Sequence, residues 1–424
     1  MNELLQQVRV VDPVSGADRI ADVLLVDGTI RAIEPSIAEL PPQTQRRESL
    51  GCILGPGLVD LYSCHSEPGF EERETLDSMV QAATAGGFTR LALLPTTTPP
   101  LDNSSVLSSL RQQTPSTPHP TLHFWGALTR QAAGVEMAEL VELAEAGVVG
   151  FTDGLPLENL MLVRRLLEYA QPLAKPIALW PCDRRLTGNG VMREGVLSMR
   201  LGLPGSPASA ETSALAALLE CIAETETPVH IMRVSTARGV ELIRTAKARG
   251  LPITASTTWM HLLLDSTAIG SYDPSLRLDP PLGNEDDRLA LLEGVKSGVL
   301  DAIAIDHTPY TYEEKTVAFA KAPPGAIGWE LALPLLWQEL VVSGDWSALE
   351  LWRALSTGPA LCLGQIPAQV TLDRPAELVL FSGDDSWTVN AQTLKSKSTN
   401  TPWLERSMMG RVRQVWHQTR GLDR

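Results

Sequence analysis

Eight short apolar runs, alternating with stretches of helical periodicity, constrain the fold more than any other feature of this sequence. Each run favours a covered, pleated surface and is followed by polar or turn residues. The runs are Leu58–Leu61, Arg90–Leu94, Thr121–Ala127, Val148–Thr152, Pro176–Trp180, Pro228–Val234, Ile253–Thr257 and Ala302–Asp306. Apolar residues recur at helical spacing in Thr75–Ala85, Met137–Ala146, Leu160–Ala170, Ser213–Glu224, Ala237–Ala248 and Asp287–Lys296. These repeats predict an α/β fold, a (β/α)8 TIM barrel, with its site at the carboxyl ends of the strands.

The two ends of the chain show a different pattern. Near the N-terminus three apolar runs are separated by turn residues: Val8–Val10, Val23–Val26 and Ile30–Ile33. Beyond Gln365 short runs return, at Val370–Leu372, Leu378–Phe381, Trp387–Val389 and Gly410–Trp416. We therefore predict a small β-sandwich domain built from residues 1–55 and 363–424, beside a barrel of residues 56–362. Ser382–Ser386 and Lys395–Pro402 are predicted to be polar loops.

Composition excludes several classes of partner. A formal net charge of −15 opposes nucleic acid and anionic membrane surfaces, which need clustered Lys and Arg. No apolar run approaches the roughly 20 residues of a spanning helix, and the first residues lack the pattern of a secretory signal. The five cysteines are scattered without paired spacing, which favours a reducing, cytoplasmic location over a disulfide framework.

The residues from Gly57 to Gly69 form a buried strand pattern that breaks into Cys-His-Ser-Glu-Pro-Gly. This stretch resembles the first barrel strand of dihydroorotases, metal-dependent amidohydrolases that close carbamoyl-aspartate to dihydroorotate. Other segments resemble signatures of the same family: Ala85–Thr89, Gly190–Gly195, Arg200–Gly205, Val234–Ala237, Ile305–Pro309, Glu313–Lys315 and Asn400–Pro402. The resemblance covers nearly the whole chain and implies a barrel of the metal-dependent hydrolase type.

The resemblance also implies where metal and substrate would bind, and most of those positions carry other residues. The family's metal-ligand positions are occupied by Tyr62, Cys64, Asp153, Trp180, Arg233 and Asp306. The positions expected to face substrate are Ser66, Thr96, Asp279, His307, Tyr310, Pro324 and Gly325. Asp306 is the only retained catalytic residue, and the register of Asp153 stays open because this strand has one acid fewer than the family pattern.

These replacements disfavour a zinc centre on chemical grounds. Tryptophan offers only an N–H donor, so Trp180 has no lone pair for zinc. Arg233 would bring a permanent positive charge to a site for two cations, and we expect it to form an ion pair with Asp306. No cofactor is therefore expected. We expect Cys64 to be a small buried residue, and His65, His230 and His261 to have structural roles.

Three hypotheses remain open from the sequence. The first is an inactive dihydroorotase homologue that acts as a structural or regulatory partner of aspartate carbamoyltransferase, or as a homo-oligomer. The second is an active dihydroorotase or cyclic-amide hydrolase, with zinc in a rebuilt site of Cys64, Cys182, Asp153 and Asp306. The third is a small-molecule sensor in which Arg233 and His307 hold a carboxylate.

Overall fold

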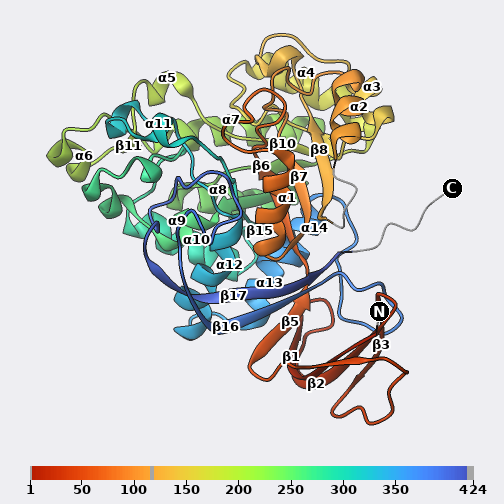
Figure 1. The fold of residues 1–424 in the computed structure, drawn as a ribbon. Helices are drawn as coiled ribbons and strands as arrows, with labels where there is room; N and C mark the ends of the chain where they lie inside the picture. The colour runs from red at the N-terminus through yellow and green to blue at the C-terminus, as the bar shows by residue number, and fades with distance from the viewer. Residues whose placement is uncertain (1, 115–118, 418–424) are drawn as a thin grey trace.

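The computed structural model describes residues 2–114 and 119–417, and a barrel of parallel strands forms its centre (Figure 1). The eight strands are β6 (Leu58–Ser63), β7 (Phe88–Leu93), β8 (Thr121–Gly126), β9 (Gly150–Phe151), β10 (Ile177–Leu179), β13 (Val229–Ile231), β14 (Ile253–Thr258) and β15 (Ala302–Ala304). They are hydrogen-bonded in chain order from β6 to β15. Backbone bonds then join the two ends, with Asp306 N 3.2 Å from Tyr62 O and Cys64 N 2.9 Å from His307 O. All eight predicted strands are present, and the predicted barrel is confirmed.

The helices lie outside the barrel and follow the strands, as the sequence periodicity predicted (Figure 1). They are α1 (Leu76–Ala85), α2 (Ser104–Gln113), α3 (Leu140–Ala146), α4 (Leu160–Ala170), α5 (Arg184–Thr187), α6 (Val196–Leu201), α7 (Ser209–Thr225), α8 (Ala237–Ala248), α9 (Trp259–Leu263), α10 (Glu285–Lys296), α11 (Tyr312–Lys315), α12 (Trp329–Leu336), α13 (Ala348–Trp352) and α14 (Gly358–Cys362). The side chain of Thr75 caps α1 and that of Asn284 caps α10, and in each case the backbone N–H of the capping residue donates to the side chain of the third helical residue. Within the described parts of the chain, no helix is long and apolar enough to cross a membrane.

Both ends of the chain contribute to one seven-stranded sheet beside the barrel. Its strands are β1 (Glu3–Asp12), β2 (Ala17–Val26), β3 (Thr29–Glu34), β4 (Gln45–Glu48), β5 (Cys52–Pro56), β16 (Leu378–Thr388) and β17 (Ser407–Trp416). The order is β17-β16-β5-β1-β2-β3, with β4 pairing parallel to β1. The antiparallel pairing of β16 with β5 joins the two ends of the chain, as predicted for a small β domain made from both termini.

Two local predictions in this sheet were wrong. Ser382–Ser386 is not a loop but the middle of β16, where the register with β17 shifts between Ser382 and Ser386. Pairing with β17 on both sides of the run, Ser382 with Arg411 and Ser386 with Met409, keeps it within the strand although Gly, Asp and Ser are disfavoured in strands. Val370–Leu372 lies outside the strands, although Val370 is buried against the sheet. A further pair of short strands, β11 (Met192–Arg193) and β12 (Gly205–Ser206), forms apart from both sheets.

Trp352 joins the terminal sheet to the barrel. Its indole is fully buried, donates to the Pro56 carbonyl at 3.2 Å, and packs edge-on against Trp337, with Phe381 of β16 also against it. Gly55 is required here because a Cβ at that position would collide with the Trp352 indole. The strand that enters the barrel is thus fixed just before the residues that form the site.

Candidate functional site

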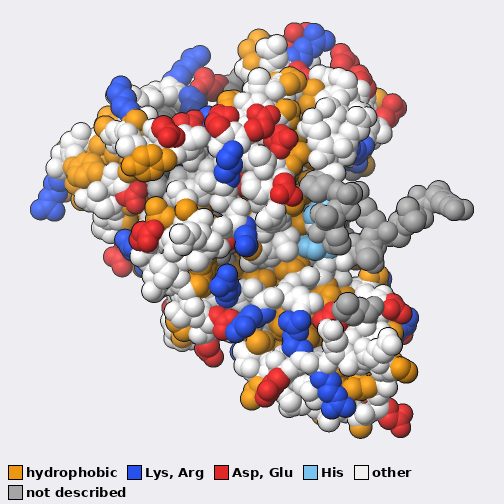
Figure 2. Space-filling view, viewed as in Figure 1, with side chains coloured by type: hydrophobic (Ala, Val, Ile, Leu, Met, Phe, Trp, Pro, Cys, Tyr) orange, Lys and Arg blue, Asp and Glu red, His pale blue; other side chains and the backbone are white. Residues whose placement is uncertain are grey.

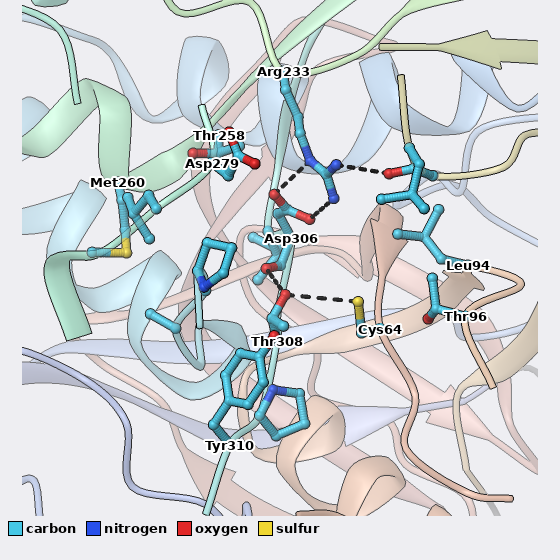
Figure 3. A pocket seen from close by; sticks show the side chains of 18 of the residues that line it. Cys64, Leu94, Thr96, Arg233, Thr258, Met260, Asp279, Asp306, Thr308 and Tyr310 are labelled. Atoms are coloured by element: carbon cyan, nitrogen blue, oxygen red, sulfur yellow. Dashed lines mark hydrogen bonds and ion pairs between the residues drawn. The ribbon is translucent and has the colours of Figure 1, made fainter. Parts of the chain in front are cut away.

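A cavity of about 280 Å³ lies at the carboxyl ends of the barrel strands (Figure 3). Ten of the predicted site residues line it: Cys64, Ser66, Thr96, Trp180, Arg233, Asp279, Asp306, Tyr310, Pro324 and Gly325. The lining does not include Tyr62, Asp153 or His307. Two arginines that carry no motif in the sequence, Arg73 and Arg184, also line the cavity.

Arg233 and Asp306 form the predicted ion pair across the mouth of the barrel. The guanidinium Nε lies 2.8 Å from one carboxylate oxygen of Asp306, and Nη2 lies 2.6 Å from the other. Nη1 donates to the Gly154 carbonyl at 2.9 Å (Figure 3). The pair is largely buried, with side-chain exposures of 8% and 16%. The neighbouring negative charge raises the pKa of Arg233 against the effect of burial, which lowers it, so the guanidinium stays charged.

Aromatic rings complete the surroundings of this guanidinium. Its central carbon lies 4.5 Å from the centre of the Trp180 ring and 5.7 Å from that of Tyr62. Both Arg233 and Asp306 adopt positive φ angles, 54° and 52°, in the left-handed region that non-glycine residues rarely enter. Two strained residues side by side indicate that the surrounding barrel fixes the ion pair in this arrangement.

Tyr62 belongs to a hydrogen-bond network inside the barrel rather than to the cavity. Its hydroxyl lies 2.9 Å from Ser256 Oγ and accepts a bond from the Arg233 backbone N–H at 3.1 Å. Ser256 Oγ in turn lies 2.8 Å from Nε2 of His230. Burial raises the pKa of the Tyr62 hydroxyl and lowers the pKa of His230 to about 3, so both groups are neutral. His230 therefore has the core role that was expected.

The structure does not bring together the four residues of the rebuilt zinc site, Cys64, Cys182, Asp153 and Asp306. Asp153 accepts bonds from the backbone N–H and the hydroxyl of Thr129, so its carboxylate is already committed. Cys182 lies 3.5 Å from Thr187 Oγ1 and lines a neighbouring cavity instead. Within residues 2–114 and 119–417, no group of three or more His, Cys, Asp and Glu side chains could hold a metal ion.

His307 also departs from its predicted role. Its Nε2 lies 2.7 Å from Glu74 Oε2, its Nδ1 accepts the Gly328 backbone N–H at 3.1 Å, and its ring stacks on Trp329 at 3.9 Å. Only 1% of either the His307 or the Glu74 side chain is exposed. With both ring nitrogens occupied, His307 cannot hold a carboxylate together with Arg233, and this part of the sensor hypothesis is wrong.

Comparisons with known proteins agree with this architecture. Residues 51–237 match the family model described as dihydro-orotase-like. The chain is 46% identical to a probable dihydroorotase-like protein from Synechocystis, over 96% of this chain and 97% of that protein. It is 36% identical to the dihydroorotase of Syntrophotalea carbinolica, over 97% of this chain and 96% of that protein.

The chain belongs to the dihydroorotase family.

Solved structures agree at the level of the fold. The L-hydantoinase (dihydropyrimidinase) of Arthrobacter aurescens superposes with a TM-score of 0.82 at 20% identity, covering 98% of this chain and 97% of that one. A dihydropyrimidinase from Brevibacillus agri gives a TM-score of 0.81 at 19% identity, covering 99% and 94%. At this identity the likeness shows the shared barrel and sheet, and the chemistry depends on the side chains.

Those side chains do not fit the zinc centre that the dihydroorotase family implies. The positions of two ligands are taken by a buried neutral phenol, Tyr62, and by an indole, Trp180, neither of which offers zinc a suitable lone pair. Burial raises the pKa of Cys64, which disfavours the thiolate that zinc requires. The guanidinium of Arg233 occupies the two oxygens of Asp306, the one retained acid. No step of a metal-dependent hydrolysis can be assigned to this arrangement.

Two buried carboxylates hold the segment of residues 395–400, which we call the strap, against the barrel. Glu330 accepts the backbone N–H groups of Lys395 and Ser396 at 2.8 to 3.0 Å. Glu74 accepts the Ser396 hydroxyl at 2.9 Å and the Lys397 backbone N–H at 3.0 Å. Neither acid was predicted from the sequence, although Glu330 lies inside the apolar helix α12, where a charged residue indicates a buried partner.

Glu330 provides a test of the strap through pH. Burial raises its pKa to about 7 from the ordinary value of 4.5. A raised folded pKa means that the stabilisation from this group is full below about pH 4.5 and is lost as pH rises towards 7. We expect the wild type to lose up to about 3 kcal/mol of unfolding free energy relative to Glu330→Gln across this range. Urea unfolding of both proteins at several pH values measures the difference.

Glu314→Gln is the matched control for that series. Glu314 is paired with Arg73 at 2.6 Å, and this interaction lowers its pKa although burial opposes it. The contribution of Glu314 to stability therefore has the opposite pH dependence. The unfolding free energy of the wild type should increase relative to that of Glu314→Gln as pH rises through the lowered pKa of Glu314. A difference between wild type and Glu330→Gln that stays constant with pH would contradict the assignment.

Proposed function

We propose that this protein is a catalytically inactive member of the dihydroorotase family that acts as a structural and regulatory partner of aspartate carbamoyltransferase in cytoplasmic pyrimidine biosynthesis. The observation that carries the proposal is the ion pair of Arg233 and Asp306, which places the protein's own cation at the barrel mouth. Hydrolysis in this class needs a metal to lower the pKa of bound water to about 7. An acid whose two oxygens are bound by Arg233 is not free to act as a base.

The first test is metal content together with turnover. We expect less than one tenth of a zinc ion per chain after purification in the presence of zinc, and no hydrolysis of dihydroorotate above background. The replaced positions would all bind the same metal centre in an active family member. Residues that act together in this way lose most of their activity when any of them is removed. An active dihydroorotase purified in the same way is the control. Near-stoichiometric zinc with chelator-sensitive hydrolysis would contradict the proposal.

The intact scaffold supports a role for the surface. The barrel closes, α1 and α10 are capped and both ends of the chain join one sheet. The positions at which the resemblance implied metal ligands, by contrast, lie at or just beyond the carboxyl ends of the strands. Substitutions that accumulate without selection would fall in the core as well as in the site. A typical core substitution would lower the free energy of unfolding by roughly 0.5–3 kcal/mol. On the face drawn in Figure 2, Lys and Arg side chains are scattered among Asp and Glu, so this face offers nucleic acid no continuous basic surface.

Pyrimidine biosynthesis supplies the chemical reason for the partner. Carbamoyl-aspartate is the product of aspartate carbamoyltransferase and the substrate of dihydroorotase, so a family member without activity retains a reason to bind the transferase. The name of the Synechocystis relative, a dihydroorotase-like protein, is compatible with such a divergent branch. A homo-oligomer is the alternative assembly.

The second test is assembly. We expect co-expression with the transferase of the same organism to give a complex that co-elutes in size-exclusion chromatography at micromolar concentration, with a buried interface of at least about 1,600 Å². Transferase activity or its regulation should differ between the complex and the free enzyme. An active dihydroorotase expressed in place of this chain is the control. Separate elution with unchanged transferase activity would refute the partnership.

A further inference from the structure

The strap alternates between buried and exposed side chains. Ser396, Ser398 and Asn400 are at most 6% exposed, whereas Lys395 and Lys397 are exposed. Such alternation is typical of an extended segment, in which residues two apart share one side. The strap therefore presents two hydroxyls and an amide to the rest of the protein along its length.

Asn400 binds the strap to the wall of the cavity at the barrel mouth. Its side-chain nitrogen donates to the Thr308 carbonyl at 2.9 Å and to the Gly325 carbonyl at 3.3 Å. Its side-chain oxygen accepts the Tyr310 backbone N–H at 3.2 Å, and its backbone carbonyl accepts that of Ile327 at 3.1 Å. Thr308, Tyr310 and Gly325 line the cavity, and Figure 3 labels the first two. One buried side chain thus connects three points of the wall.

Ser398 bonds the strap to a second segment of the wall. Its hydroxyl donates to the Arg73 carbonyl at 2.8 Å. Arg73 lines the cavity, and its guanidinium carbon lies 4.8 Å from the centre of the Tyr310 ring. The strap therefore contacts this side of the cavity at two separate places in the chain.

Glu330 holds the other end of the strap and forms no ion pair within the described parts of the chain. It accepts two strap N–H groups and is only 8% exposed. The charged side chains that face it are Glu74, which is buried, and Lys395 and Arg411, which are exposed. Helix α1 contributes only Ala85 to the small cavity beside it. A negative charge on Glu330 is therefore held by N–H groups rather than by a buried cation.

We infer that the strap is a pH-sensitive latch: ionisation of Glu330 favours its release, and release frees the cavity wall at Thr308, Tyr310 and Gly325. The device combines a buried acid at one end of the strap with an amide that binds the wall at the other. The inference does not rest on the proposed function, because neither a metal nor a partner protein takes part in it.

The direction of the pH effect follows from the two states of the strap. In the closed state, burial raises the pKa of Glu330 to about 7, although the strap N–H groups lower it in part. In the released state, water surrounds the carboxyl and its pKa returns towards the ordinary 4.5. The closed state therefore holds one more proton between these values, and each pH unit favours release about ten-fold. Above about pH 7 both states are ionised and the dependence ends.

Hydrogen exchange of the full chain between about pH 5 and 7 tests the inference. The backbone N–H groups of Ser396 and Lys397 report the anchored end, and those of Tyr310 and Ile327 report the wall. After correction for the intrinsic exchange rate at each pH, we expect both opening constants to rise together about ten-fold per pH unit. Opening constants that do not change with pH, or a rise at the anchored end alone, would overturn the inference.

The backbone N–H of Phe151 distinguishes release of the strap from global unfolding. It donates to the Pro176 carbonyl at 2.9 Å in the barrel, and Phe151 is fully buried. We expect the strap and wall reporters to have opening constants at least about ten-fold larger than that of Phe151, because local release needs less free energy than unfolding of the barrel. Equal opening constants would show that the strap opens only with the whole fold, and that no latch exists.

Two variants separate the acid from the link to the wall. Glu330→Gln removes the titrating group and should abolish the pH dependence at both ends. Asn400→Ala keeps the acid, so Ser396 should retain the dependence whereas Tyr310, which loses its acceptor, should not. A folded Glu330→Gln protein with the pH dependence of the wild type would overturn the inference.

Glu339→Gln is the matched control. Glu339 is an exposed acid on the helical turn after α12 (Trp337–Val342), so its replacement should leave both opening constants and their pH dependence unchanged. Where Glu330→Gln does not fold, Asn400→Ala decides: a Tyr310 opening constant that still rises ten-fold per pH unit would overturn the link between strap and wall.

Discussion

Replacing Asp306 with Asn is expected to lower the free energy of unfolding by about 3–5 kcal/mol, because it leaves Arg233 buried without a counter-charge. The guanidinium retains the Gly154 carbonyl and two aromatic faces, but none of these carries a negative charge. Urea unfolding of the wild type and the variant measures the loss. In a protein whose site acid serves catalysis, removal of that acid usually costs activity rather than stability.

Asp279→Asn is the matched control for this prediction. It removes the carboxylate of a second cavity pair, Arg184 with Asp279 at 2.6 Å, in which the arginine side chain is 34% exposed. Water solvates the remaining Arg184, so we expect a loss of only about 1 kcal/mol. The double variant Arg233→Met with Asp306→Leu should recover most of the loss, since apolar residues can replace a buried pair. An Asp306→Asn protein as stable as Asp279→Asn would contradict the structural role of the ion pair.

Glu74→Gln is expected to have an effect of similar size, about 3 kcal/mol, although the shape of the side chain is retained. The backbone N–H of Gly328 donates to Nδ1 of His307, so Nε2 carries the proton and donates to Glu74. The Ser396 hydroxyl and the Lys397 N–H also donate to Glu74. An amide turns one of two acceptor oxygens into a donor, so at least one buried donor must lose its partner.

The strap gives this prediction a second measurement. We expect hydrogen exchange at Lys395–Lys397 to become faster in Glu74→Gln than in the wild type, because Glu74 is one of the two acids that bind this segment. Glu314→Gln, which changes an acid of a part-exposed ion pair, should cost about 1 kcal/mol and leave strap exchange unaltered. Unchanged stability and unchanged exchange in Glu74→Gln would show that the Glu74 contacts contribute nothing.

The site differs from that of a zinc hydrolase in the identity of its cation rather than in its scaffold. Arg233 is a fixed, directional cation that binds oxygens in one plane, whereas a metal ion activates water. This difference is the basis of the proposal that the barrel mouth does not hydrolyse an amide. Arg233 and Asp306 form this ion pair with both residues in the left-handed region of φ.

The sequence by itself determined the barrel and its eight strands. The alternation of apolar runs with helical segments can be read from neighbouring residues alone. A strand that is buried on both faces appears in the sequence as a continuous apolar run, so it can be identified without knowing its partners. The pairing of Arg233 with Asp306 could also be predicted, because the ends of barrel strands converge and a buried charge needs a counter-charge.

Only the tertiary structure decided where the other polar side chains point. His307 binds Glu74, which is 233 residues away in the chain, and Asp153 turns to Thr129 rather than to the cavity. Glu74 and Glu330 carry no motif, yet they anchor the strap because its backbone N–H groups are buried beside them. A residue type at a strand end fixes which bonds are possible, but the direction of the side chain depends on which donors the closed fold brings within 3 Å.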